Sequence, residues 1–149
     1  MKPYKITYLF TFLLLFLFQT ISFAASPIGF WKTIDDTTGR AKGIVKISGT
    51  ANNLSGTIVK LFPGAMTICT ACKGNLQNKP ILGMTVMYGL KMDARNPNEW
   101  SGGTIFDPKT GQVYRCNLTV SADGRTLNVR GYIGISLFGR SQTWVKVGK

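Results

Sequence analysis

Alternating side-chain polarity, broken by turn sequences at short intervals, is the feature that most limits how this chain can fold. Within residues 39–48, Ala41, Gly43, Val45 and Ile47 fall on one face of an extended chain. A period of two is typical of a half-buried antiparallel strand. Turn sequences recur roughly every 8–12 residues, as in sandwiches and barrels. The sequence therefore predicts an all-β domain, and its sequential hairpins favour one up-and-down antiparallel barrel, whose closure removes exposed strand edges.

Two further hairpins extend this pattern. A strand over residues 55–62 is expected to follow a turn at Asn52 and Asn53. Strands over residues 114–120 and 126–132 are expected on either side of a Ser-Ala-Asp-Gly turn. Glycine, asparagine and aspartate favour such turns because they tolerate backbone conformations or local hydrogen bonds that other residues do not. The region after residue 24 shows no convincing helical period.

Residues 1–24 have the pattern of a secretory signal peptide. Two lysines precede the apolar run 6–18, and small residues stand at Ser22 and Ala24, the positions that a signal peptidase reads. The run is shorter than the roughly 20 apolar residues of a membrane-spanning helix. We therefore expect cleavage after Ala24 and a single soluble domain, residues 25–149, in the periplasm or outside the cell.

Charge and side-chain inventory limit the possible functions. The 149 residues include 18 basic and 6 acidic side chains, for a net charge of +12. Such a charge favours anionic partners, although it also serves solubility alone. The absence of histidine excludes Ser-His and Cys-His pairs and imidazole metal sites. Most carboxylates lie in turns, where backbone N–H groups keep them ionised. We therefore expect no enzymatic activity, no cofactor and no metal.

Residues 63–92 interrupt the strand pattern and are expected to form largely a long ordered loop. The motif Cys69-x-x-Cys72 lies within it. In an oxidising compartment this pair is expected to form a disulfide. Two alternatives remain: redox-active thiols that would make the protein a thiol–disulfide partner, and metal ligands, a set that stays incomplete even with Cys116. Cys116 itself lies on an apolar strand face and is expected to be a buried free thiol.

Several segments of the chain carry a resemblance to a known family. They are Gly29–Lys32, Cys69–Gly74, Lys79–Met84, Trp100–Gly111 and Arg130–Trp144. Together they resemble the exported bacterial family known as domain of unknown function 2147, over nearly all of residues 25–149. The resemblance implies a small exported barrel of lipocalin-like appearance and brings no established activity. Cys116 departs from the family pattern, so its role cannot be taken from the family.

The start of the expected domain, Gly29-x-Trp31, also resembles calycin barrels. In those barrels a tryptophan of the first strand closes the bottom, and a basic residue of the last strand packs across its indole. The resemblance implies this role for Trp31, with Arg140 or Lys146 as its basic partner. The alternative is an ordinary core tryptophan that happens to lie near a glycine.

Residues 130–140 form an apolar run that contains three glycines and lies between two arginines. Glycines inside a strand mark bends or close backbone approach. One interpretation is a cavity wall in which Arg140 offers its guanidinium to a carboxylate or phosphate. The other is a structural role, in which Arg140 pairs with Asp107 or stacks on Trp31 or Trp144.

Together these patterns predict a non-enzymatic barrel that binds a small hydrophobic or amphiphilic ligand in the cell envelope. The expected ligand-binding residues are Trp31, Met84, Tyr88, Tyr132, Phe138 and Arg140, with Phe30, Met87 and Phe106 adding to the apolar lining. The alternative is an interaction protein with a filled core that contacts anionic envelope components through exposed basic residues. Those residues are Arg40, Lys42, Lys46, Arg115 and Arg130. Nucleic acid is not an expected partner, because the aromatic residues are not interleaved with the basic ones.

Overall fold

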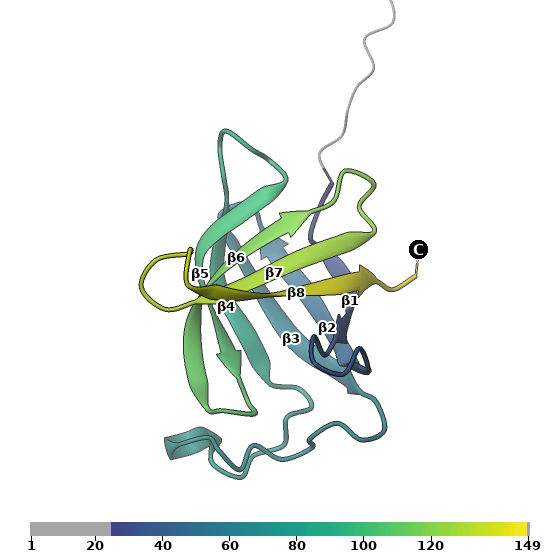
Figure 1. Cartoon of the computed structure of the whole chain (residues 1–149), viewed down its shortest axis with the longest axis vertical. Helices are drawn as coiled ribbons and strands as arrows, with labels where there is room; N and C mark the ends of the chain where they lie inside the picture. The colour runs from purple at the N-terminus through teal and green to yellow at the C-terminus, as the bar shows by residue number, and fades with distance from the viewer. Residues whose placement is uncertain (1–24, 149) are drawn as a thin grey trace, which may run out of the picture.

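A computed structural model describes residues 25–148, so the predicted signal peptide lies outside the described residues. Eight strands follow one another along the chain: β1 Gly29–Ile34, β2 Ala41–Thr50, β3 Asn53–Leu61, β4 Thr85–Met92, β5 Glu99–Asp107, β6 Gln112–Val120, β7 Thr126–Tyr132 and β8 Gly139–Lys146. Each strand pairs antiparallel with the next, and β1 pairs with β8, which closes the barrel (Figure 1). The predicted all-β up-and-down barrel is confirmed.

The strands form where the sequence alternates. In β2 the side chains of Val45 and Ile47 are buried between partly or fully exposed neighbours, and in β6 the same holds for Cys116 and Leu118. The turn between β6 and β7 is held by Asp123, whose carboxylate accepts hydrogen bonds from the Ser121 hydroxyl at 2.6 Å and the Arg125 amide at 3.0 Å. Because these interactions join residues that are close in sequence, turn residues in the sequence are enough to predict this hairpin.

The prediction of a largely loop-like segment over residues 63–92 is wrong for its last part. Its last part forms β4, and only residues 62–84 connect β3 to β4, with a short 3-10 helix, η1, at Gly74–Leu76. The register between β3 and β4 shifts on both sides of Gly56. As a result Val86 and Met87 are both buried although they are neighbours in sequence. Bulges of this kind break the period of two, which is why alternation did not reveal β4.

The barrel has a filled end and an open end. The filled end holds the start of β1, the end of β8 and the β2–β3, β4–β5 and β6–β7 turns. Large buried side chains pack there: Trp31, Ile47, Leu54, Leu90, Trp100, Leu118, Val120 and Leu127. The opposite end is surrounded by the β1–β2, β3–β4, β5–β6 and β7–β8 loops. The hydrophobic core therefore closes one end of the barrel and leaves the other available for a site.

Candidate ligand cavity

A cavity of about 1040 Å³ opens at the loop-bearing end of the barrel. Its wall is built from inward side chains of six strands: Val45, Ile58, Val86, Ile105, Val129 and Trp144. Ionisable side chains gather at its mouth: Asp35, Arg40, Lys42, Asp107, Lys109 and Arg140. Small-molecule sites in proteins typically occupy about 300–1,000 Å³ and combine apolar walls with a few polar groups. The cavity thus has the size and the polarity pattern that are typical of small-molecule sites.

Small residues on the inner face help to keep this half of the barrel hollow. Gly131 of β7 lines the cavity. A Cβ atom placed on Gly131 would lie 3.5 Å from Cβ of Tyr114 and 3.6 Å from Cγ2 of Ile105, which are ordinary van der Waals distances. The backbone at Gly131 therefore has room for a side chain that the sequence does not supply, and that room belongs to the cavity.

Two ion pairs organise the β1–β2 loop at the mouth. Asp35 lies 2.5 Å from Nζ of Lys42 and accepts a 2.8 Å hydrogen bond from the Thr38 amide. The bond from Lys42, followed by the amide bond, lowers the pKa of Asp35 far below its usual range. Asp36 pairs with Arg140, and this contact lowers the pKa of Asp36 and raises that of Arg140. Both carboxylates are thus held ionised, and they face different partners.

The partner of Arg140 differs from the partners expected for a structural role. Arg140 was expected to pair with Asp107 or to stack on Trp31 or Trp144, and instead its Nε and Nη2 donate to Asp36. The closure of β8 against β1 brings the β1–β2 loop beside the start of β8. Because these residues are 104 positions apart, local sequence patterns contain no sign of the contact. The Arg140 side chain remains 63% exposed.

The predicted ligand-binding residues divide into two groups. Tyr132, Phe138 and Arg140 line the mouth of the cavity, and so does Phe106. Trp31, Met84 and Tyr88 do not line it, and neither do Phe30 and Met87. Trp31 is buried at the filled end, Met84 is packed in the core, and Tyr88 is half exposed, with its hydroxyl donating to the Thr85 carbonyl at 2.6 Å. Sequence reasoning missed Arg40 and Lys109 as mouth residues, because they lie in turns whose meeting depends on barrel closure.

Trp31 has the arrangement that the calycin resemblance implies. Its Nε1 donates a 2.6 Å hydrogen bond to the Pro27 carbonyl, and Nζ of Lys146 lies 4.7 Å from the ring centroid. The basic residue across the indole is therefore Lys146, not Arg140. The Lys146 ammonium also donates to the Ile28 carbonyl at 3.1 Å, and burial lowers its pKa. This cluster ties the chain before β1 to the end of β8 and closes the filled end.

Cys69 and Cys72 form the expected disulfide, in the β3–β4 loop. Both residues are buried, and the loop packs against the β5–β6 turn: a Cβ on Gly111 would lie only 2.2 Å from the Ala71 carbonyl oxygen. The disulfide therefore holds a loop that supports the mouth. Cys116 is the buried free thiol that its strand face predicted, and burial raises its pKa to about 12. Within residues 25–148, no three potential metal ligands cluster.

We expect alkylation to label one cysteine in the unfolded, non-reduced protein and none in the native protein. The disulfide protects Cys69 and Cys72, while Cys116 is fully buried and protonated at neutral pH. The thiolate is the reactive form of cysteine, so Cys116 in the native protein is neither accessible to the reagent nor ionised. Intact-mass measurement after iodoacetamide treatment checks this, with a reduced, unfolded sample as the control that gains three labels. Rapid native labelling of Cys116 would contradict the packing described here.

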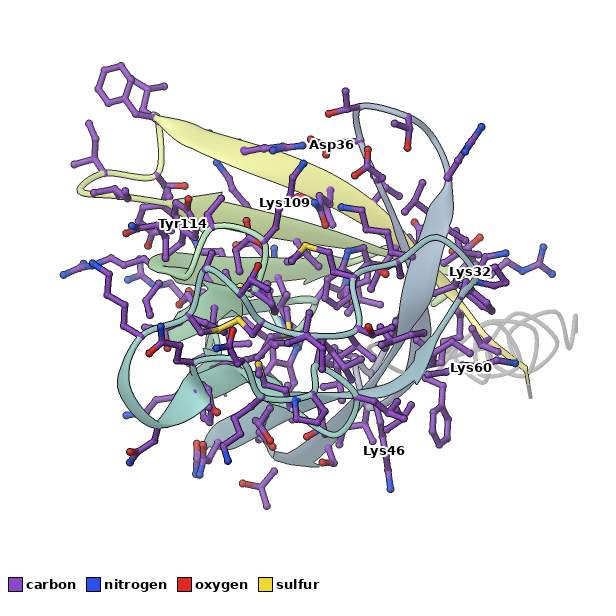
Figure 2. All side chains as sticks on the ribbon, turned by 90° about the horizontal axis from the view of Figure 1, so that it is seen from below. Lys32, Asp36, Lys46, Lys60, Lys109 and Tyr114 are labelled. Carbon is purple, nitrogen blue, oxygen red and sulfur yellow. A yellow bond between two sulfur atoms is a disulfide. The ribbon has the colours of Figure 1, made fainter. Side chains whose placement is uncertain are left out.

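The basic residues expected to contact anionic envelope components do not lie together on one side of the barrel. Arg40, Lys42 and Lys46 lie in or beside β2, whereas Arg115 and Arg130 lie on β6 and β7, on another side of the closed barrel. Lys42 is also engaged by Asp35. Figure 2 shows instead that the side chains of Lys32, Lys46 and Lys60 point outward together, on the side away from Tyr114. Because the sheet is closed into a barrel, residues that all face outward from their strands lie on different sides of the molecule.

A closed eight-stranded antiparallel barrel with an apolar cup open at one end defines a lipocalin-like protein. In keeping with this, the chain is similar in structure to a protein from the human pathogen Helicobacter pylori that is described as belonging to the lipocalin family. The TM-score is 0.71 at 14% sequence identity, over 83% of this chain and 84% of that one. At this identity the likeness concerns the fold.

The chain belongs to the family described as "uncharacterized protein conserved in bacteria", domain of unknown function 2147, whose model matches residues 29–146. The match spans all eight strands of the barrel. The resemblance drawn from the sequence segments is therefore confirmed. No curated protein sequence matches the chain. In the part of the chain that the structure describes, no helix has both the length and the apolar character needed to cross a bilayer.

Proposed function

We propose that this protein is an exported, non-enzymatic barrel that binds a small hydrophobic or amphiphilic ligand in its open cavity. The observation that carries the proposal is the cavity of about 1040 Å³ with an apolar wall. A space of this size argues against the alternative of a filled-core barrel. Residues 1–24, with their basic start, apolar middle and small residues at the end, support export to the cell envelope. The burial of Cys69 and Cys72 argues against a thiol–disulfide partner.

The charges at the mouth favour a ligand with an acidic head. Within residues 25–148, carboxylates form ion pairs only with Lys42 and Arg140, which leaves Arg40 and Lys109 unpaired at a mouth where Asp107 is the one carboxylate without an ion pair. Arg140 uses Nε and Nη2 for Asp36, so its Nη1 has no assigned partner. A carboxylate or phosphate at the mouth would gain charge-assisted hydrogen bonds from these side chains, while its chain lies along the apolar wall.

We expect Arg140→Met to weaken binding of an acidic amphiphile about two- to fivefold. The effect is limited because Arg140 is largely exposed, and exposed charge pairs contribute about 1 kcal/mol or less. Competition between a long-chain fatty acid and a fluorescent fatty-acid probe measures the change. The fatty alcohol of the same length is the matched ligand control and should bind wild type and variant equally. Lys91→Met, on the β4 segment near the filled end, is the control variant.

The proposal as a whole is tested with the same probe and with native mass spectrometry of protein purified from its own host. Binding of the probe, its displacement by amphiphiles, and a co-purified small molecule are the expected results. A wild-type protein that binds no probe and no member of a panel of acidic and neutral amphiphiles would contradict the proposal.

The non-enzymatic part of the proposal rests on the acid–base inventory. The chain has no histidine, and nearby donors lower the pKa of Asp35, Asp36 and Asp123. A carboxyl group with a lowered pKa is a poor general acid near neutral pH. A broad esterase, phosphatase, amidase and glycosidase screen tests this part. Turnover that survives stringent purification and disappears in Asp36→Asn protein would identify an enzyme instead.

A further inference from the structure

The loop between β7 and β8, residues 133–138, presents large apolar side chains to solvent. Ile133, Ile135, Leu137 and Phe138 are between 61% and 75% exposed. Single exposed apolar residues are common on protein surfaces, but a contiguous group of them indicates an interaction site. Figure 1 shows this loop, in yellow-green, projecting to one side of the barrel. The loop therefore carries an apolar surface that the barrel itself does not cover.

The backbone of this loop is held in place by Arg130. The Arg130 Nε donates to the Ser136 carbonyl at 2.8 Å, and Nη2 donates to the Leu137 carbonyl at 3.1 Å. Its Nη1 donates to the Ser141 hydroxyl at 3.0 Å, which joins the loop to β8. A guanidinium that satisfies several loop acceptors keeps the loop ordered. The exposure of the apolar side chains is thus built into the fold.

The apolar loop lies beside basic residues at the cavity mouth. Ile133, Leu137 and Phe138 line the mouth together with Lys109, and Arg115 pairs across the sheet with Tyr132 at the base of the loop. Neither Lys109 nor Arg115 forms an ion pair with a carboxylate in the described part of the chain. Apolar side chains next to uncompensated cations are the combination by which proteins attach to anionic lipid surfaces.

We propose that residues 133–138 dock the barrel, with its mouth toward the lipid, onto membrane surfaces that contain anionic phospholipids. The apolar side chains enter the boundary between head groups and acyl chains, and the neighbouring cations meet phosphate groups. Self-association through the same loop is disfavoured because two copies repel each other: the net charge of +12 for the full sequence becomes 12 − 2 = +10 once Lys2 and Lys5 leave with residues 1–24. The inference stands independently of whether the cavity holds a ligand.

Vesicle sedimentation tests the docking surface. The protein should sediment with vesicles of equal parts phosphatidylglycerol and phosphatidylethanolamine, and much less with phosphatidylcholine vesicles. The double variant Leu137→Ser/Phe138→Ser should lower the partition coefficient about tenfold or more, because it removes two side chains that would be buried in lipid. Phe30→Ser is the matched control, since Phe30 is 45% exposed on the outer face of β1, and it should bind as wild type does.

Charge reversal at two sites distinguishes the contribution of the cavity mouth to membrane binding from the contribution of the protein's net charge. Lys109→Glu lies at the mouth, and Lys91→Glu lies on β4 near the filled end, with the same change in net charge. Lys109→Glu should weaken binding roughly thirtyfold, because the reversal changes the charge by two units and each unit near an anionic surface contributes about 1 kcal/mol. Lys91→Glu should have a clearly smaller effect. Equal effects of the two reversals would overturn docking through the mouth.

A tryptophan introduced into the loop reports insertion directly. Trp31, Trp100 and Trp144 are buried, so brominated acyl chains should quench only the added residue in Phe138→Trp protein. Phe30→Trp is the control and should not be quenched. The inference is overturned if wild type ignores the anionic vesicles, if Phe138→Trp is not quenched, or if the serine double variant instead abolishes a dimer seen by analytical ultracentrifugation. Probe displacement without vesicles measures the ligand proposal separately, so either proposal can fail alone.

Discussion

Gly131→Phe should weaken ligand binding at least about tenfold while the barrel stays folded. Gly131 lines the cavity, and a Cβ there meets only ordinary contacts with Tyr114 and Ile105. The aromatic ring must therefore occupy the space available to a ligand. We expect the affinity for a fluorescent fatty-acid probe to fall by at least about tenfold, because even one misfitting apolar group in a hydrophobic pocket costs about 1–3 kcal/mol of binding free energy. Stability should change by only about 1 kcal/mol, because glycine weakens a strand interior by roughly 0.5–1 kcal/mol relative to alanine.

The matched control is Asn128→Phe, which places the same ring on the outer face of β7. Asn128 is exposed and does not line the cavity, so probe binding should remain unchanged. Circular dichroism and urea unfolding of both variants verify the fold. Full probe binding by folded Gly131→Phe protein would show that ligands, if any, bind elsewhere, and the cavity proposal would then be wrong.

Trp31→Ala should lower the free energy of unfolding by about 3–5 kcal/mol, the usual range for removing a large buried aromatic side chain. Trp31 is fully buried, donates to the Pro27 carbonyl, and lies beneath the Lys146 ammonium. Its removal leaves a cavity at the filled end and leaves the Pro27 carbonyl without its donor. Because native domains are stable by only about 5–15 kcal/mol, much of the protein's stability would be lost.

Urea unfolding measures this change as a lower midpoint with an unchanged slope. The neighbouring Phe30→Ala is the control, because its ring is 45% exposed on the outside of the barrel, and it should cost less than about 1 kcal/mol. Trp31→Phe should fall between the two, since it keeps part of the packing and loses the indole hydrogen bond. A Trp31→Ala effect no larger than that of Phe30→Ala would contradict a closing role for Trp31.

The candidate site could be predicted only in part. Tyr132, Phe138 and Arg140 lie at the cavity mouth because one apolar, glycine-rich segment carries all three, and that segment is visible in the sequence. Trp31 and Tyr88 were assigned to the same lining because they are aromatic. Composition does not tell which end of the barrel a side chain reaches, or which face. That depends on each residue's height along its strand and on bulges such as those beside Gly56.

What the sequence by itself determined is local. A period of two together with turn residues specifies a hairpin, so the strand over residues 126–132 was predicted with the bounds that β7 has, and consecutive hairpins favoured an up-and-down barrel. The tertiary structure alone decided the rest. Closure of β1 on β8 brings Asp36 to Arg140 and Lys146 over Trp31, and the same closure encloses the cavity beside Gly131. These features depend on how eight strands tilt and register around one axis, and no short stretch of sequence encodes that geometry.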